Sequence, residues 1–182
     1  DETVIVATDT NKRALIKVGG GEPGEEIEGS RRAIADDYVP VGARTFRLAS
    51  TEGLAAGDPI VVFRPATDKW IDALGTSDLG WKPHTYDMRY ERRVKAVNGR
   101  KLTIGAPIVC AIDSRFGGGS VYKTTPDERI SRVGVEDIRL VSDYEKGRER
   151  RDEEHAWEAV EVGNLRDGWV QNVTAVHFGY SC

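Results

Sequence analysis

Two short segments near the C-terminal end of the sequence repeat one pattern, and this repeat constrains the fold more than any other feature. Residues 136–141 (EDIRLV) and 171–176 (QNVTAV) each place an Asp or Asn directly before a short apolar run. The alignment pairs Asp137 with Asn172, Ile138 with Val173, Leu140 with Ala175, and Val141 with Val176. Asp and Asn at matching positions can stack into ladders at the corners of a coil of strands. The repeat therefore favours a solenoid over a plain antiparallel sandwich, which also has short strands at intervals.

Similar short runs of β-branched residues occur toward both ends of the chain. Residues 3–18, 133–162 and 166–179 each contain short apolar runs next to polar turns, which is the pattern of strands joined by tight corners. We therefore assign residues 1–39 and 126–182 to the rungs of the coil.

The segment 40–125 follows a different pattern. Residues 40–64 predict a strand, a turn and a second strand, and Asn98-Gly99 is a type I′ hairpin signal between two alternating runs. These features predict a small antiparallel β-barrel or sandwich inserted into the coil. The only helical turn that we expect lies within residues 67–74.

This sequence resembles bacterial right-handed parallel β-helix proteins of the pectin-lyase-like superfamily in three segments, residues 130–144, 152–162 and 166–181. Residues 53–64 and 91–108 are similar to the small β-module that interrupts the helix in some of them. The superfamily includes polysaccharide lyases, glycoside hydrolases, phage tailspikes and proteins with no known activity. The resemblance implies an all-β fold, a right-handed parallel β-helix with few rungs, and an extracellular or cell-surface protein that faces carbohydrate. No segment matches the catalytic signature of one lyase or hydrolase family, so the resemblance carries over no catalytic residue.

Charge and hydropathy argue against two classes of partner. A formal net charge of −4 over 182 residues argues against nucleic acid as the main partner, because phosphate binding needs a basic face. The sequence also has no apolar run of about 18 residues, the length that would predict a membrane-spanning helix. Cys110 and Cys182 could form one disulfide or none, so they do not indicate a redox compartment.

A charged cluster interrupts the coil pattern at residues 145–157. Nearby carboxylates can poise an imidazole as a general base, so His155 and Glu154 are the candidate catalytic residues. The same acids could help to hold Ca²⁺, which prefers clustered oxygen ligands, and no other cofactor is expected. The alternating charges favour the alternative, in which residues 152–155 belong to an exposed, solvated loop without a catalytic role and arginines pair with the acids. The pairing residues would be Arg148, Arg150 and Arg151 with Asp152, Glu153 and Glu154.

The long segment 66–87 carries aromatic side chains in polar surroundings. A sugar can stack its C–H face on an aromatic ring while nearby polar groups bind its hydroxyls. Trp157, beside the charged cluster, adds one more ring. The candidate carbohydrate-binding residues are therefore Trp70, Trp81, His84, Tyr86 and Trp157. The alternative is that the rings of the loop cover the junction between the insert and the coil.

Two hypotheses of function follow. The first is an extracellular polysaccharide lyase or glycoside hydrolase that acts at a groove between the side loops of the coil and the insert. The second is a non-catalytic structural, adhesive or filament-forming solenoid that binds glycan or stacks end to end. Only two or three rungs are visible in the sequence, and neither end shows a cap. We therefore expect either a fragment of a longer β-helix or a protomer that associates with other copies through its open strand edges.

Overall fold

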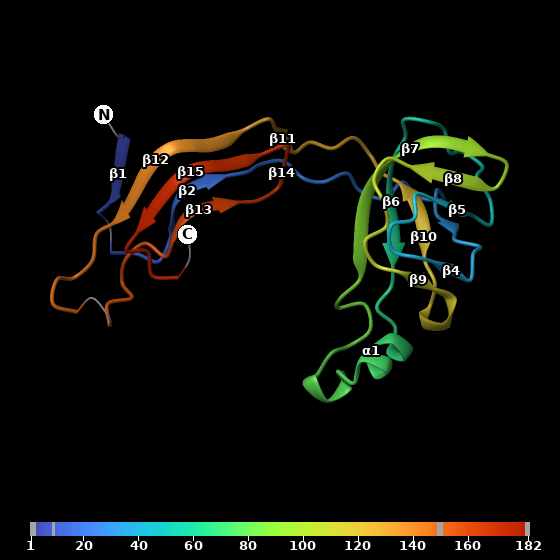
Figure 1. The fold of residues 1–182 in the computed structure, drawn as a ribbon, viewed down its shortest axis with the longest axis horizontal. Helices are drawn as coiled ribbons and strands as arrows, with labels where there is room; N and C mark the ends of the chain where they lie inside the picture. The colour runs from blue at the N-terminus through green and yellow to red at the C-terminus, as the bar shows by residue number, and fades with distance from the viewer. Residues whose placement is uncertain (1–2, 9, 149–150, 181–182) are drawn as a thin grey trace. The chain divides into compact units, whose positions relative to one another are not determined.

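The computed structural model describes residues 3–8, 10–148 and 151–180, and it divides the chain into two compact units. Unit 1 comprises Asp1–Pro23 and Asp127–Cys182, and unit 2 comprises Gly24–Pro126. Both units are built of β-strands, and the described residues contain few helical segments (Figure 1). These helical segments are α1 (Asp68–Leu74) and two short 3₁₀ helices, η1 (Ser77–Leu79) and η2 (Ser114–Phe116). Over the described part of the chain, no helix has the length and hydropathy needed to cross a bilayer.

Every strand pair described in unit 1 is parallel. The three-stranded sheet has the order β1-β12-β15, and two further sheets pair β2 with β13 and β11 with β14. The strand bounds are β1 Thr3–Ala7, β2 Ala14–Val18, β11 Ile130–Ser131, β12 Gly134–Ser142, β13 Glu158–Val162, β14 Leu165–Arg166 and β15 Trp169–Val176. Successive passes of the chain therefore contribute neighbouring strands to the same sheets.

The register of β12 and β15 confirms the alignment of the two repeated segments. Ile138 lies opposite Val173, and the pairing continues without a shift through the aligned residues that follow. At the corner, Asn172 Nδ2 donates a hydrogen bond of 2.6 Å to Asp137 Oδ1. Both residues have a positive φ, 54° for Asp137 and 50° for Asn172, which Asp and Asn tolerate better than most residues. The polar ladder thus marks a left-handed bend that recurs in successive passes.

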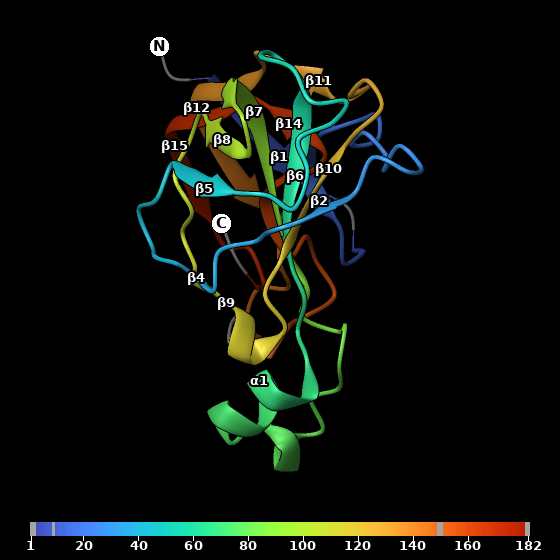
Figure 2. The same ribbon diagram turned by 90° about the vertical axis from the view of Figure 1, so that its right-hand side faces the viewer.

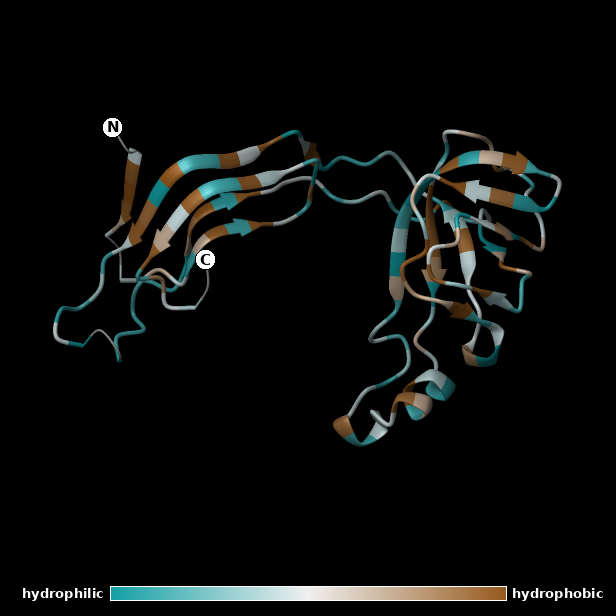
Figure 3. Cartoon of the chain, in the orientation of Figure 1, coloured by the Kyte–Doolittle hydropathy of each residue, from teal (hydrophilic) through white to brown (hydrophobic). Residues whose placement is uncertain are grey.

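The interior of unit 1 is lined by side chains that stack along the parallel sheet. Leu140 is fully buried and lies in register with Ile5 on one side and Ala175 on the other. Colouring by hydropathy shows polar and apolar residues intermixed along β12 and β15, as expected for strands with one face turned inward (Figure 3). The edge strands β1 and β15 also carry exposed apolar residues, among them Val4 and Val170.

Unit 2 contains a six-stranded antiparallel sheet with the order β3-β10-β6-β7-β8-β5. Its strands are β3 Arg32–Ala33, β5 Thr45–Arg47, β6 Pro59–Arg64, β7 Met88–Asn98, β8 Lys101–Ile104 and β10 Ser120–Lys123. A bridge between Ile34 and Leu48 joins the two ends of this sheet, so the sheet curls back on itself (Figure 2). The enclosed core is aliphatic and includes the fully buried Leu102, Ile108 and Val121.

The division of the chain differs from the expected one. Residues 24–39, which the sequence analysis assigns to the coil, lie in unit 2. In this segment Glu26 bridges to Thr124, β3 pairs with β10, and β4 (Tyr38–Val39) pairs with β9 (Ile112–Asp113). Antiparallel pairing with the C-terminal part of unit 2 therefore places these residues in unit 2.

Two local expectations in unit 2 have different outcomes. The helical turn expected within residues 67–74 is present as α1. The hairpin expected at Asn98-Gly99 also forms, but Asn98 pairs with Lys101, so the two-residue loop is Gly99-Arg100. Only Gly99 has a positive φ, as in a type II′ turn rather than the expected type I′.

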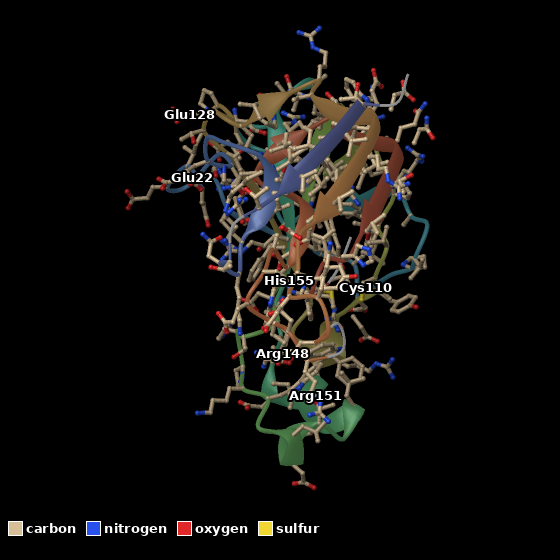
Figure 4. All side chains as sticks on the ribbon, turned by 90° about the vertical axis from the view of Figure 1, so that its left-hand side faces the viewer. Glu22, Cys110, Glu128, Arg148, Arg151 and His155 are labelled. Atoms are coloured by element: carbon tan, nitrogen blue, oxygen red, sulfur yellow. The ribbon has the colours of Figure 1, made fainter. Side chains whose placement is uncertain are left out.

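The chain passes between the units twice, and within unit 1 the two crossing segments are hydrogen-bonded to each other. The Glu128 N–H donates to the Glu22 carbonyl at 3.1 Å, and the Ile130 N–H donates to the Gly20 carbonyl at 3.1 Å. Glu22 and Glu128 are labelled on these segments in Figure 4. Gly21 permits this approach, because a Cβ at this residue would lie only 2.1 Å from the Glu128 carbonyl oxygen.

Candidate functional site

Unit 1 contains a pocket where the chain leaves β1 and β12. Since these strands are parallel and Ala7 lies opposite Ser142, the segments that follow them emerge at the same edge of the sheet. The Asp143 N–H donates to the Ala7 carbonyl at 2.8 Å and holds the two segments together. The pocket has a volume of about 380 Å³ and is lined by Thr8, Thr10, Asp143, Tyr144, Glu145, Asp152, Glu154 and His155.

Asp152 organises the loop that forms one wall of this pocket. Its Oδ2 accepts a 2.7 Å hydrogen bond from the Glu145 N–H, and its Oδ1 accepts a 2.9 Å bond from the Glu154 N–H. The hydrogen bond from Glu145 is the main cause that lowers the pKa of the Asp152 carboxyl, and the bond from Glu154 adds to it, while partial burial opposes the shift. The ionised carboxylate therefore holds both ends of the loop.

Replacing Asp152 by asparagine is expected to destabilise unit 1 at neutral pH and to do so less in acid. The folded protein lowers the pKa of this group below its unfolded value of about 4, so its contribution is full above that value and is lost as the pH falls through the folded pKa. Thermal unfolding of the wild type and Asp152→Asn over a pH series measures the difference. The control is Asp78→Asn, which removes the same charge at an exposed position of unit 2. A stability difference that stays constant over the whole series would contradict this role.

His155 is buried beside Asp152, contrary to the expectation of a fully exposed cluster. It is only 7% exposed, and its Nδ1 lies 3.6 Å from Asp152 Oδ2, too far for a hydrogen bond. Among the residues that the structure describes, none forms a hydrogen bond with this buried nitrogen. Figure 4 shows His155 among the packed side chains of unit 1, with Arg148 and Arg151 on the loop that precedes it. The expectation of exposure is therefore wrong for His155, although Glu153 and Glu154 are exposed.

The charge pairs of the loop also differ from those expected. Lys12, from the distant N-terminal segment, pairs with Glu153 at 3.9 Å and with Glu154 at 3.6 Å. Arg148 pairs instead with Glu145, at 2.9 Å. Arg150 lies outside the described residues. The loop is thus attached to the preceding pass of the coil by a cation that the local sequence does not reveal.

The arrangement of acids gives calcium no direct support. In residues 3–8, 10–148 and 151–180, no three His, Cys, Asp or Glu side chains are grouped so that they could hold a metal ion. Calcium binding therefore stays a prediction.

Unit 2 holds most of the predicted carbohydrate-binding residues in one aromatic cluster. The Trp81 ring stacks on Tyr86 with centroids 4.0 Å apart, and it lies 6.1 Å from the Trp70 ring. Thr67 caps α1 by accepting a hydrogen bond from the Trp70 N–H, which fixes the first of these rings at the start of the helix. The guanidinium of the buried Arg64 lies 4.6 Å from the Trp70 ring centroid. We call Trp70, Trp81 and Tyr86 the aromatic platform.

Two polar side chains, His84 and Asp87, belong to the same loop segment as Trp81 and Tyr86. His84 Nδ1 lies 3.3 Å from Asp87 Oδ2, and the other carboxylate oxygen of Asp87 accepts a 2.8 Å hydrogen bond from the Ala66 N–H. The His84 side chain is exposed, and Tyr86 is 41% exposed. The structure thus groups His84 with the three rings of the platform in one loop region of unit 2.

Trp157, the fifth candidate, lies in unit 1 and does not belong to the aromatic platform. Its ring stacks on Tyr180 with centroids 5.8 Å apart, and Lys12 Nζ lies 4.8 Å from its centroid. The Trp157 Nε1–H donates to the Glu153 carbonyl at 3.0 Å. The predicted set therefore divides between the units, with Trp157 next to the loop of the pocket.

Of the residues that line the pocket, His155 and Glu154 are predicted from the sequence as site residues, but most of the others are not. Thr8 and Asp143 show no local motif, and they come together only because β1 and β12 run in parallel and end at the same edge. An alignment of residues 3–8 with the two repeated segments could have predicted that these residues lie together.

Comparisons with known proteins identify structural neighbours but no sequence family. No protein-family model matches the chain, and no curated protein matches it. The tailspike protein gp49 from Pseudomonas phage LKA1 is 21% identical with a TM-score of 0.36, and the match covers 78% of this chain and 20% of that protein. The Pseudomonas phage phi297 tailspike gp61 is 20% identical with a TM-score of 0.40, covering 96% and 26%.

A third neighbour is the Gp54 tailspike of Acinetobacter baumannii bacteriophage AP22, solved in complex with A. baumannii capsular saccharide. It is 10% identical with a TM-score of 0.41, and the match covers 96% of this chain and 30% of that protein. These three neighbours are phage tailspikes, and the chain spans 20% to 30% of their length.

Proposed function

We propose that this chain is the glycan-binding part of an extracellular or cell-surface β-protein and that it binds sugar through the aromatic platform of unit 2. The observation that carries the proposal is the stack of Trp81 on Tyr86, in which one ring supports another that is partly open to solvent.

The chemistry of the aromatic platform suits a sugar ring. An aromatic face offers a flat apolar surface to the C–H groups of a sugar, at little conformational cost because the ring is already held by its neighbours. His84 and Asp87 lie in the same loop segment as Trp81 and Tyr86, where they can exchange hydrogen bonds with sugar hydroxyls. Rings and polar groups together provide both kinds of contact that carbohydrate recognition needs.

We further propose that unit 1 is a short piece of a right-handed parallel β-helix that unit 2 interrupts. Parallel pairing in each of its three sheets supports this proposal, as does the polar ladder from Asp137 to Asn172. A rigid coil of this kind would serve as the scaffold that presents the binding unit. End-to-end association of copies stays a prediction of the sequence analysis.

Replacing Trp81 by alanine is expected to weaken glycan binding about tenfold or more, because this ring contacts both other members of the platform. Binding is measured on a microarray of bacterial surface polysaccharides and then by titration with the polysaccharide that gives the strongest signal.

Trp169→Ala is the matched control, since it removes an exposed tryptophan from unit 1. This variant should bind as the wild type does, and circular dichroism should show both variants folded. Failure of the wild type to bind any polysaccharide, or full binding by Trp81→Ala, would contradict the proposal.

Catalysis by His155 and Glu154 stays a prediction. Both residues line the pocket of unit 1, and the burial of His155 supports a role beyond a solvated loop. A polysaccharide lyase or glycoside hydrolase is therefore the second candidate function, and a non-catalytic structural or adhesive protein is the third.

A further inference from the structure

The pocket of unit 1 is strongly acidic. Four carboxylates, those of Asp143, Glu145, Asp152 and Glu154, line it, and the described lining contains no lysine or arginine. Glu145 and Glu154 are partly neutralised at its border by Arg148 and Lys12. The remaining negative charge favours a cation inside the pocket.

Within the described part of the chain, two of these carboxylates, Asp143 and Asp152, form no ion pair with a Lys or Arg side chain. The Asp152 oxygens accept backbone N–H groups and face the His155 ring, and Asp143 Oδ1 accepts the Tyr144 N–H at 3.1 Å. Among the described residues, none forms an ion pair with Asp143. Its side chain is exposed at the pocket, where it can receive a ligand.

His155 adds an independent observation that points to a ligand. Its Nδ1 is buried and lacks a hydrogen bond within the described part of the chain, although a buried polar atom of this kind is normally paired. Asp152 Oδ2 lies 3.6 Å away, which is too long for a direct bond but leaves two acceptors side by side when Nδ1 carries no proton. A donor with several N–H groups would satisfy both atoms.

We propose that this pocket binds the primary ammonium group of an amino sugar. An ammonium group has three N–H donors and no acceptor, so it matches His155 Nδ1, Asp152 Oδ2 and the free side of Asp143. Thr8 and Tyr144 also line the pocket, and their hydroxyl groups can bind the hydroxyls of the sugar ring. The volume falls within the range that is usual for small-ligand pockets.

The same charges disfavour an acidic sugar. A uronate placed among these four carboxylates would meet repulsion, and the described lining offers no guanidinium to neutralise it. The pocket therefore selects by charge against the substrates of a uronate lyase. This inference stands independently of glycan binding by the aromatic platform, because the pocket belongs to unit 1 alone.

Nuclear magnetic resonance titration of the full 182-residue chain tests the proposal at about pH 7, where a primary amine is still mostly protonated and a free imidazole is mostly uncharged. The probes are glucosamine, N-acetylglucosamine, glucose and lysine. Glucosamine should shift the amide signals of Thr8 and Asp143 and the Nδ1 signal of His155. Its dissociation constant should be at least about tenfold lower than those of the two uncharged sugars.

Asp143→Asn should weaken glucosamine binding about tenfold, since it removes a charged acceptor from an exposed position where the fold is tolerant. Asp78→Asn carries the same charge change outside the pocket and should bind as the wild type does. Equal binding of glucosamine and N-acetylglucosamine, or unchanged binding by Asp143→Asn, would overturn the ammonium assignment. Binding of lysine as tight as that of glucosamine would overturn the assignment to a sugar.

Discussion

Replacing Gly21 by alanine is expected to destabilise unit 1 by about 3 kcal/mol or more. Two costs add at this position. The residue has a φ of 71°, which disfavours any side chain, and the new Cβ would lie 2.1 Å from the Glu128 carbonyl oxygen and 2.9 Å from the Arg129 nitrogen. Backbone atoms cannot rotate away, so the two crossing segments must separate and lose their hydrogen bonds.

Gly147→Ala is the control, because it separates backbone strain from crowding. Gly147 also lies in unit 1 and has a positive φ, but a Cβ there would have no atom of the described residues within 4 Å. Gly147→Ala should lower the stability of unit 1 by only about 1 kcal/mol. Hydrogen exchange of peptides from unit 1 measures both variants, since two compact units need not unfold in one transition. Equal losses in the two variants would show that the segments are not closely paired.

Replacing Leu140 by alanine is expected to destabilise unit 1 by about 2 to 5 kcal/mol. The side chain is 0% exposed and lies between Ile5 and Ala175 in the stacked sheet, so its removal leaves a cavity that its neighbours cannot fill. Val170→Ala is the control on the neighbouring strand, where the side chain is 50% exposed, and it should change stability by about 0.5 kcal/mol or less.

The effect of Leu140→Ala is measured by the hydrogen-exchange rates of β12 and its two neighbouring strands. Exchange there should accelerate in Leu140→Ala, while the core strands of unit 2 keep the exchange rates of the wild type. A loss as small as that of Val170→Ala would mean that the stack does not form the interior of unit 1.

The register of β12 and β15 in unit 1 could be predicted from the sequence because its signal is local and periodic. Asp137 and Asn172 take the same left-handed backbone conformation, which only a few residue types adopt readily, and each precedes the same apolar pattern. Matching these two residues fixed all the pairs that follow, since a strand cannot slip by one residue without exposing its inner face.

The limits of the insert and the burial of His155 could not be predicted, because both depend on partners that are distant in sequence. Residues 24–39 join unit 2 through pairing with β9 and β10, which lie far along the chain. His155 is surrounded by charges in the sequence, and such runs are usually solvated. Its burial follows from the packing of successive passes, while Lys12 from the first pass pairs with the adjoining acids.

The hydrogen-bonded crossings at Glu22 and Glu128 have a consequence for the history and engineering of this chain. Because the departing and returning segments are neighbours in unit 1, everything between Pro23 and Asp127 is attached at a single point of that unit. Modules whose termini adjoin in this way can be excised, or exchanged for another module, by recombination at one short turn. A scaffold of parallel strands could in this way keep its architecture while its specificity is replaced as a cassette.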